Sequence, residues 1–452
     1  MAENEPLNCF KAYDIRGKVP DELNEEIVYR LGRAFADEFS PRVVVVGRDV
    51  RLESPAFAAE LCRGLNDGGV NVFDIGLCGT EEVYFQTFSR RVDGGIMVTA
   101  SHNPKGYNGL KLVREGARPV SGDTGLFALR DRMIRGMFGE KNAKGTTISI
   151  PEKGAYIEHL LGYIDLSILK PFRIVANPGN GGAGEIIRQL EQHLPFHFEL
   201  IQEKPDGNFP NGVPNPLLVE NRLATSQAVV DYQADLGIAW DGDFDRCFLF
   251  DAQGRFIEGY YLVGLLAEAI LAKHPAEKII HDPRLTWNTI DMVHSAGGFP
   301  VQSKTGHAFI KERLRAENAV YGGEMSAHHY FREFAYCDSG MIPWLLVTEL
   351  MTKTGKPFAQ LVEERIALYP CSGEINYQVA NAEVVIERVR KIFTGLEHHT
   401  DNTDGLSMEF TDWRFNLRSS NTEPLLRLNI ETKGDLAGLD QRLAEIEEII
   451  KR

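Results

Sequence analysis

The stretch LGIAWDGDFDR, residues 236–246, joins a short apolar run to a loop with an aspartate at every second position. The apolar run is typical of a buried strand, and the loop begins where such a strand leaves the core. In α/β proteins, ligands gather at loops beyond the carboxyl ends of strands. This stretch therefore predicts a strand and a functional loop together, in an α/β fold.

The same order of elements recurs along the chain. A β-branched run, a Gly- or Asp-rich loop and a helical pattern follow one another at 43–61 and 174–190, and a further strand and loop occur at 278–284. Strands that alternate with helical patterns indicate α/β units, and the spacing predicts three such units in series. After about residue 370, helical patterns at 383–389 and 436–450 enclose strand-like runs, which predicts a smaller α+β domain.

Composition and charge place the chain among soluble globular proteins. Hydrophobic residues make up 43% and charged residues 25%, which is ordinary for that class. The sequence shows no secretory signal, no run of about 18 apolar residues and no C-x-x-C spacing. We expect a cytoplasmic protein. The net charge of −15 argues against nucleic acid or a membrane as partner, but not against a small anionic substrate, because salt screens distant carboxylates over roughly 10 Å.

The aspartate loop is the strongest chemical signal. Alternation predicts an extended segment with Asp241, Asp243 and Asp245 on one side, where their mutual repulsion needs a cation. Hard oxygen ligands in that number suit Mg²⁺. An EF-hand is excluded, because it would need glycine at Arg246 and glutamate at Ala252. The alternative is a solvated acidic turn.

A second loop, TASHNP at 99–104, follows the apolar run GGIMV at 94–98. Thr, Ser, Asn and Pro are ordinary turn residues, so this loop has two interpretations. Either it caps the next segment, or it presents Ser101 as a nucleophile or a phosphate carrier.

Two further loops suit a sugar phosphate. In GGEMSAH, residues 322–328, Glu324 and Ser326 are two positions apart and could point the same way, toward paired hydroxyl groups. In RSSNTEP, residues 418–424, followed by Arg427, guanidinium and hydroxyl groups could bind phosphate oxygens. A capping serine and a Ser/Thr-rich turn are the respective alternatives. Together, one such loop for each predicted domain would surround a sugar phosphate in a central cleft.

These four loops, in this order, resemble the signature loops of the α-D-phosphohexomutase family over essentially the whole chain. The resemblance implies three topologically related α/β domains and a C-terminal α+β domain of the TATA-box-binding-protein-like kind, heart-shaped around a central cleft. The form GEMSxH looks like the phosphomannomutase and phosphomannomutase/phosphoglucomutase branch. We expect the domains at 1–150 (phosphoserine loop), 151–252 (metal loop), 253–368 (sugar loop) and 369–452 (phosphate loop).

The resemblance implies two phosphoryl transfers through a phosphoserine. Phospho-Ser101 phosphorylates a hexose monophosphate, and the resulting hexose 1,6-bisphosphate returns its other phosphate to Ser101. One Mg²⁺ per chain, held by Asp241, Asp243, Asp245 and an oxygen on Ser101, neutralises the transferring group. Free hexose 1,6-bisphosphate is implied as an activator. Arg246, beside the metal loop, adds positive charge.

The other implied site residues handle a proton or hold the substrate. The candidates for the hydroxyl proton are His328, Lys111 and His307. Arg284 stands where related enzymes often carry lysine, which keeps the charge but changes the donor geometry. The implied substrate-binding residues are Tyr13, Arg16, Arg284, Glu324, Ser326, Arg418, Ser420, Asn421, Thr422 and Arg427.

The expected reaction interconverts mannose 6-phosphate and mannose 1-phosphate, supplying GDP-mannose for polysaccharide synthesis. A phosphoglucomutase or a dual-specificity hexose phosphomutase is the alternative. A metal-dependent sugar phosphatase would have to admit water, which a closed cleft should exclude. A non-catalytic sugar-phosphate-binding protein need not keep Ser101 and all three aspartates. The expected assembly is a monomer or a homodimer.

Overall fold

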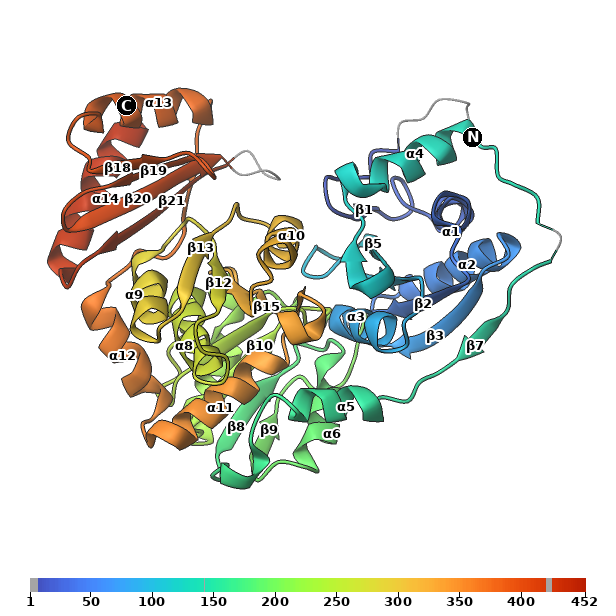
Figure 1. Cartoon of the computed structure of the whole chain (residues 1–452), viewed down its shortest axis with the longest axis horizontal. Helices are drawn as coiled ribbons and strands as arrows, with labels where there is room; N and C mark the ends of the chain where they lie inside the picture. Colours follow the sequence, from blue (N-terminus) through green and yellow to red (C-terminus); the bar gives the residue numbers. More distant parts are fainter. Residues whose placement is uncertain (1–6, 142, 420–424) are drawn as a thin grey trace. The chain divides into compact units, whose positions relative to one another are not determined.

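The computed structural model describes residues 7–141, 143–419 and 425–452. The chain forms two compact units, whose helices and strands are labelled in Figure 1. Unit 1 comprises residues up to Phe256 together with Glu333–Lys353, and unit 2 comprises Ile257–Arg332 and the residues from Thr354 onward. Each unit contains two sheets with their helices.

The first sheet of unit 1 has the strand order β1-β5-β4-β2-β3-β7, and β6 pairs with β5. Strands β2, β3, β4 and β7 run parallel, whereas β5 is antiparallel to both β4 and β1. The side chains of Val44, Val45 and Val46 on β2 are fully buried, as the β-branched run predicts. The elements are β1 (Ile15–Lys18), α1 (Glu25–Phe39), β2 (Val43–Arg48), α2 (Ser54–Asp67), β3 (Asn71–Leu77), α3 (Thr80–Ser89), β4 (Gly94–Val98), β5 (Tyr107–Arg114), β6 (Arg118–Pro119), α4 (Leu126–Arg135) and β7 (Thr147–Ser149).

The second sheet of unit 1 has the order β11-β10-β8-β9. Its strands β8, β9 and β10 are parallel, so the loops that follow β8 and β10 leave the same edge of the sheet. Helix α11 also belongs mainly to this unit. The elements are α5 (Gly154–Leu161), β8 (Arg173–Asn177), α6 (Ala183–Glu191), β9 (His197–Leu200), α7 (Leu223–Asp231), β10 (Leu236–Trp240), β11 (Cys247–Phe250) and α11 (Ile342–Thr354). Unit 1 also contains β16 (Cys337–Asp338), which is not a strand of this sheet.

The first sheet of unit 2 contains β13, β12, β14 and β15 in that order. Strand β12 is parallel to β13 and β14, and β15 returns antiparallel. The run Leu262–Ala267 lies in α8, which is buried almost all round, as expected of a packed helix. The elements are α8 (Gly259–Leu271), β12 (Lys278–His281), α9 (Trp287–Ser295), β13 (Phe299–Gln302), α10 (His307–Glu317), β14 (Tyr321–Gly323), β15 (His329–Phe331) and α12 (Phe358–Leu368).

The C-terminal sheet is antiparallel, with the order β17-β21-β20-β19-β18. Helices α13 and α14 cover it (Figure 1), and their apolar residues share one core with the sheet. The predicted α+β domain is therefore confirmed. The elements are β17 (Ile375–Gln378), α13 (Ala382–Phe393), β18 (His399–Asp401), β19 (Leu406–Glu409), β20 (Trp413–Ser419), β21 (Leu425–Thr432) and α14 (Leu436–Lys451).

The structure also describes the cysteines and the hydropathy of the helices. All six cysteines are free thiols, five of them buried. Within the described ranges, no helix combines the length and the hydropathy that a membrane crossing requires.

Helices α1 and α2 cross with their backbones in close contact. A Cβ atom placed on Gly64 would lie 2.2 Å from the carbonyl oxygen of Tyr29, and one on Gly32 would lie 2.6 Å from that of Leu61. Backbone cannot give way as a flexible side chain can. The crossing therefore requires glycine at both positions.

Replacing Gly64 with alanine should separate the two helices. We expect the unfolding free energy to fall by roughly 2–3 kcal/mol, because the overpacked methyl group meets backbone. Gly154→Ala is the matched control, since its new Cβ would meet nothing within 4 Å. Differential scanning calorimetry should show a lower melting temperature for Gly64→Ala only. Equal melting temperatures for both variants would contradict the tight crossing.

Candidate active site

Ser101 lies in the turn just after β4, with its backbone in the left-handed region at φ 48°. Strain of this kind is held in place only where the surrounding structure fixes it. The sequence predicts a loop residue outside the core. The loop position is confirmed, but the residue is only 1% exposed. Its Oγ donates a hydrogen bond to Asp241 Oδ2 at 2.8 Å.

Arg51 holds the serine loop in place and was not singled out from the sequence. Its guanidinium donates to the backbone oxygens of Ser101 (2.9 Å), Pro104 (3.1 Å) and Tyr107 (2.9 Å). Its Nε lies 3.4 Å from Asp49 Oδ2, and both side chains are 2% exposed. The loop carbonyls are therefore gathered around one buried cation.

The three aspartates are gathered by a turn, which corrects the extended segment that alternation predicts. Phe244 has φ 41° and its N–H donates to the Asp241 carbonyl at 3.1 Å. The turn brings one carboxylate oxygen from each of Asp241, Asp243 and Asp245 within 4.8 Å of the others. Period-two alternation requires strand geometry, and this segment leaves the strand at Trp240. The carboxylates still converge, because the turn brings them together and not because they alternate along a strand.

Two cations, one on a strand and one in the aspartate loop, compensate the buried carboxylates. Lys111 on β5 places its Nζ 2.7 Å from Asp243 Oδ2 and 2.5 Å from Asp245 Oδ2. Arg246 Nε lies 3.4 Å from Asp241 Oδ2. Burial, and then the charges of the other two aspartates, raise the pKa of Asp241 to about 8. Burial alone would lower the pKa of Lys111, but Asp243 and Asp245 reverse this and raise it.

The aspartate cluster fits a divalent cation. Oδ1 of Asp241 and Oδ1 of Asp243 are buried without a hydrogen-bond partner, although buried carboxylate oxygens are normally satisfied. Three hard oxygen ligands around one point suit Mg²⁺. Thr80 Oγ1 orients one ligand by donating to Asp243 Oδ2 at 2.6 Å. An ion here would lie beside Ser101, whose Oγ touches Asp241.

The loop after β8 supports the aspartate turn. A Cβ on Gly181 would lie 2.9 Å from the Gly242 carbonyl oxygen, and one on Gly242 would lie 2.7 Å from that of Ser101. Asn211 Nδ2 donates to Asn180 Oδ1 at 2.9 Å, which links this loop to the one before Pro214. The sequence indicates turns here but no role. The packing shows that both loops fix the position of the aspartate turn.

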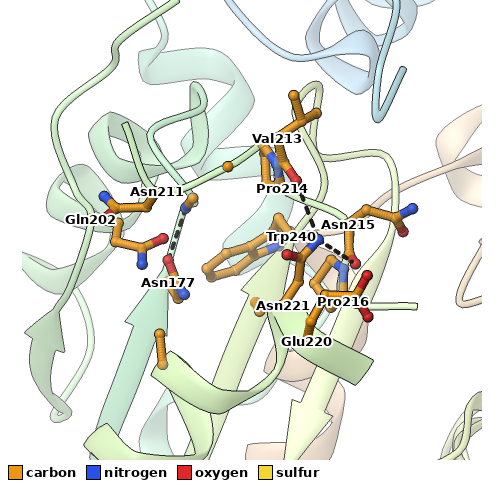
Figure 2. Close-up of a pocket in the computed structure, with 14 residues that line it drawn as sticks. Asn177, Gln202, Asn211, Val213, Pro214, Asn215, Pro216, Glu220, Asn221 and Trp240 are labelled. Carbon is orange, nitrogen blue, oxygen red and sulfur yellow. Dashed lines mark hydrogen bonds between the residues drawn. The ribbon is translucent and has the colours of Figure 1, made fainter. Parts of the chain in front are cut away.

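A small cavity lies beside these loops (Figure 2). Asn221 Nδ2 donates to the carbonyls of Val213 and Asn215, and Trp240 forms part of the lining. Its volume is about 70 Å³, well below the roughly 300 Å³ of a typical small-molecule site. The cavity is therefore too small to be the substrate site.

Of the remaining unit 1 residues, Arg16 contacts the serine loop and His102 contacts Ser101 itself. Arg16, on β1, donates through Nε to Asp14 Oδ2 at 2.7 Å and through Nη1 to Asn103, so it lies beside the serine loop. Tyr13 is half-buried two residues before β1. His102, which the sequence reasoning did not single out, has Nδ1 3.1 Å from Ser101 Oγ. Burial, followed by the charge of Arg246, holds its pKa well below the ordinary value.

In unit 2, the sugar loop and the loop after β12 share one edge of the sheet. Asp282 joins them, because its carboxylate pairs with Arg284 Nη2 at 2.7 Å and accepts from the Met325 N–H at 2.9 Å. Glu324 Oε1 and Ser326 Oγ lie 3.6 Å and 3.4 Å from the same Arg284 nitrogen. Both predicted sugar-binding side chains therefore lie against one guanidinium.

His307 and His328 lie close to the same loop. His307 begins α10 directly after Gly306. The two imidazole rings are 6.4 Å apart, and His328 Nδ1 is 3.5 Å from Glu324 Oε2. Imidazole and carboxylate groups so placed can orient and exchange a hydroxyl proton.

Three guanidiniums converge on one carboxylate in unit 2. Glu374 Oε2 is 2.7 Å from Arg418 Nη2 and 3.7 Å from Arg284 Nη1, and Glu374 Oε1 is 3.4 Å from Arg427 Nη1. The Nε atoms of Arg284 and Arg418 are buried without a hydrogen-bond partner. Of the predicted phosphate loop, Ser420, Asn421 and Thr422 lie outside the described residues.

Buried neighbours fix the arginine cluster. Arg414 donates to the carbonyls of Pro283 and Arg284 at 3.0 Å each and pairs with Glu431 at 2.8 Å. Burial, followed by the charge of Arg284, lowers the pKa of Arg418. Rigid guanidiniums with spare donors are well suited to a phosphate. Neither Arg414 nor Glu374 was identified from the sequence, because both act through contacts between distant strands.

The chain matches four sequence profiles in order along its length. They are described as phosphoglucomutase/phosphomannomutase alpha/beta/alpha domains I, II and III and the C-terminal domain. The matched residues are 7–136, 154–254, 258–369 and 374–449.

Relatives and solved structures agree with these profiles. "Phosphohexose mutases" of Xanthomonas campestris pv. campestris is 61% identical over 445 residues, covering 98% of this chain and 99% of the relative. "Phosphomannomutase" of Escherichia coli K12 is 56% identical over 443 residues, covering 96% and 97%. A phosphoglucomutase/phosphomannomutase family protein from Burkholderia thailandensis has a TM-score of 0.88 at 32% identity, covering 98% and 97%.

Mg²⁺ should stabilise the protein through the aspartate cluster. Saturating Mg²⁺ should raise the melting temperature by roughly 2–5 °C, because an ion that binds only the folded state stabilises it. Asp243→Asn removes one ligand charge and should remove most of this rise. Asp123→Asn, at an exposed aspartate outside the cluster, is the control and should keep it. An undiminished rise in Asp243→Asn would place the ion elsewhere.

Proposed function

This chain belongs to the phosphoglucomutase/phosphomannomutase family, and on that premise we propose that it interconverts mannose 6-phosphate and mannose 1-phosphate. Members of the family are isomerases that move a phosphoryl group within one hexose. Relatives that are 52–59% identical over 96–99% of this chain carry the name phosphomannomutase. The observation that carries the proposal is Ser101, buried against three aspartates with its Oγ on Asp241.

The proposed reaction consists of two phosphoryl transfers. In the first, the bond between phosphorus and Ser101 Oγ breaks while phosphorus bonds to the free hydroxyl of the hexose monophosphate. The hydroxyl loses its proton to a protein base, and the serine oxygen leaves as an alkoxide that takes up a proton. In the second transfer, the other phosphate of the hexose 1,6-bisphosphate returns to Ser101 Oγ by the reverse steps.

The residues around Ser101 can stabilise the changes in charge and protonation at its oxygen during the two transfers. His102 and Asp241 both contact Oγ, so they can orient the hydroxyl and hold its proton. Lys111 and Arg246 supply fixed positive charge beside the transferring group. One Mg²⁺ held by the three aspartates would neutralise phosphate charge during transfer. We assign Arg16 to the same phosphate, and its contacts with Asp14 and Asn103 beside the serine loop support this.

Unit 2 supplies binding groups for the rest of the substrate. We assign the sugar hydroxyls to Glu324 and Ser326, and the phosphate that is not being transferred to Arg284, Arg418 and Arg427. His307 and His328, beside Glu324, are the candidates for the hydroxyl proton. The assignment of Ser420, Asn421, Thr422 and Tyr13 to substrate binding rests on the family resemblance.

Glucose phosphates are the second candidate substrates. The relatives from Xanthomonas campestris carry the broader name "Phosphohexose mutases" at 61% identity. Coupled assays with mannose 1-phosphate and glucose 1-phosphate, with the matching 1,6-bisphosphate as activator, decide between them. We expect a higher kcat/KM for mannose 1-phosphate; equal values would indicate dual specificity.

Further parts of the proposal rest on the resemblance alone. We place the enzyme in the cytoplasm, as a monomer or homodimer, with the domain boundaries given above. It would supply mannose 1-phosphate for GDP-mannose and polysaccharide synthesis. Hexose 1,6-bisphosphate would act as activator by restoring phosphoserine on any dephosphorylated chain.

Replacing Ser101 with alanine should abolish turnover. We expect kcat to fall by roughly 10⁴-fold or more, because the phosphate carrier is removed. The coupled assay measures this, and intact mass spectrometry should show phosphorylation of wild type but not of the variant. Ser149→Ala, at an exposed serine, is the control. Turnover of Ser101→Ala within tenfold of wild type would rule out the covalent route.

Replacing Arg418 with alanine should weaken substrate binding. Loss of a charge-assisted contact costs roughly 2–3 kcal/mol, or about 30- to 150-fold in KM. Turnover should fall too, since remote binding energy helps position the reacting hydroxyl. Arg390→Ala, on α13 at a distance in sequence from the cluster, is the control. Unchanged KM and kcat in steady-state assays would show that Arg418 is structural.

A further inference from the structure

Glu374 is the residue in the arginine cluster that the phosphate-binding role does not explain. It directly precedes β17. The neighbouring strand β21 carries Arg427, and the strand beyond it, β20, carries Arg418. An anion-binding site gains nothing from a carboxylate in its centre, because like charges repel. Its position therefore requires a separate reason.

The sheet register itself creates a need for this carboxylate. Arg418 and Arg427 are directly opposite each other on β20 and β21, and like charges in that arrangement destabilise a sheet. Arg284 adds a third cation, as its Nη1 also points to Glu374. Side-chain exposures of 4–5% for Arg284 and Arg418 leave little solvent to screen the repulsion. A carboxylate between them lowers this cost when no phosphate is bound.

The charge count also bears on phosphate release. Asp282 already pairs with Arg284, so the charges of Arg418 and Arg427 are offset by the one carboxylate of Glu374 and an excess of one positive charge remains. Without Glu374 the excess would be two. A hexose 1,6-bisphosphate must leave this cluster between the two transfers in order to present its other end. A site that binds phosphate too tightly would slow that exchange.

We propose that Glu374 is a positioning residue that holds the three arginines in place and competes with phosphate for them, so that the bound phosphate exchanges readily. The purpose we give to phosphate exchange rests on the proposed mutase reaction. The effect of Glu374 on phosphate affinity does not depend on that reaction. The carboxylate is 23% exposed, so it can turn toward solvent as phosphate arrives. Arg284 keeps its contact with Asp282 when Glu374 turns away.

The test compares phosphate affinities of full-length variants. Isothermal titration calorimetry with inorganic phosphate should give a dissociation constant about tenfold lower for Glu374→Gln than for wild type, since one nearby negative charge is removed. Glu383→Gln removes the same charge at the exposed first turn of α13 and should stay within twofold of wild type. Combining Glu374→Gln with Arg418→Ala should cancel the gain, which locates it at this cluster.

Kinetics provide a second readout that a purely structural role would not produce. For Glu374→Gln, KM and kcat for mannose 1-phosphate should both fall severalfold, because phosphate binds more tightly and leaves more slowly. Glu374→Asp keeps the charge and should restore values close to wild type. It also provides the test if Glu374→Gln does not fold.

Weaker or unchanged phosphate binding by Glu374→Gln would overturn the proposal, as would a Glu374→Asp variant in which phosphate binds tenfold more tightly than in wild type. The proposed function can fail separately. If wild type does not interconvert mannose phosphates but Glu374→Gln gains phosphate affinity, the mutase assignment is wrong and the role of Glu374 stands. If wild type interconverts mannose phosphates but Glu374→Gln does not gain phosphate affinity, the mutase assignment stands and the proposed role of Glu374 is wrong.

Discussion

The burial of three carboxylates against one serine is the constraint on which the site in unit 1 depends. Asp241, Asp243 and Asp245 repel one another in a region with little water, so each must be compensated. Lys111 and Arg246 supply part of that compensation. A divalent cation would supply more, and a phosphate on the serine oxygen would then bind to the cation. The same electrostatic demand therefore explains the lysine on β5 and the position of Arg246 beside the aspartates.

Sequence patterns predicted the helices and strands better than they predicted the contacts between side chains. The β-branched runs of β2 and β8 and the amphipathic helices α13 and α14 were identifiable, because burial imposes a local period on them. The aspartate motif was identifiable as well, although its geometry is a turn. Arg51, His102 and Glu374 were missed. Their contacts depend on loop packing and on strand register, and no period in the sequence records either of these.

The two ends of the substrate would meet opposite electrostatic environments. Around Ser101, an excess of carboxylate would create a site for a cation and, through it, for a phosphate. Around Glu374, an excess of guanidinium would bind a phosphate directly. In each cluster the excess charge is partly offset by residues of opposite sign, Lys111 and Arg246 in the first and Glu374 and Asp282 in the second. Partial compensation keeps a buried site folded when it is empty and still leaves it able to bind.

A single-turnover experiment with isotopically labelled phosphate tests the central claim most directly. Phosphorylated enzyme is mixed with mannose 1-phosphate whose phosphate carries ¹⁸O, with enzyme in excess, and both the product and the protein are analysed by mass spectrometry. If Ser101 carries the phosphate, mannose 6-phosphate will contain the unlabelled phosphate from the enzyme, and the ¹⁸O label will be on the peptide that contains Ser101. Retention of the label in mannose 6-phosphate, with none on the protein, would contradict transfer through Ser101.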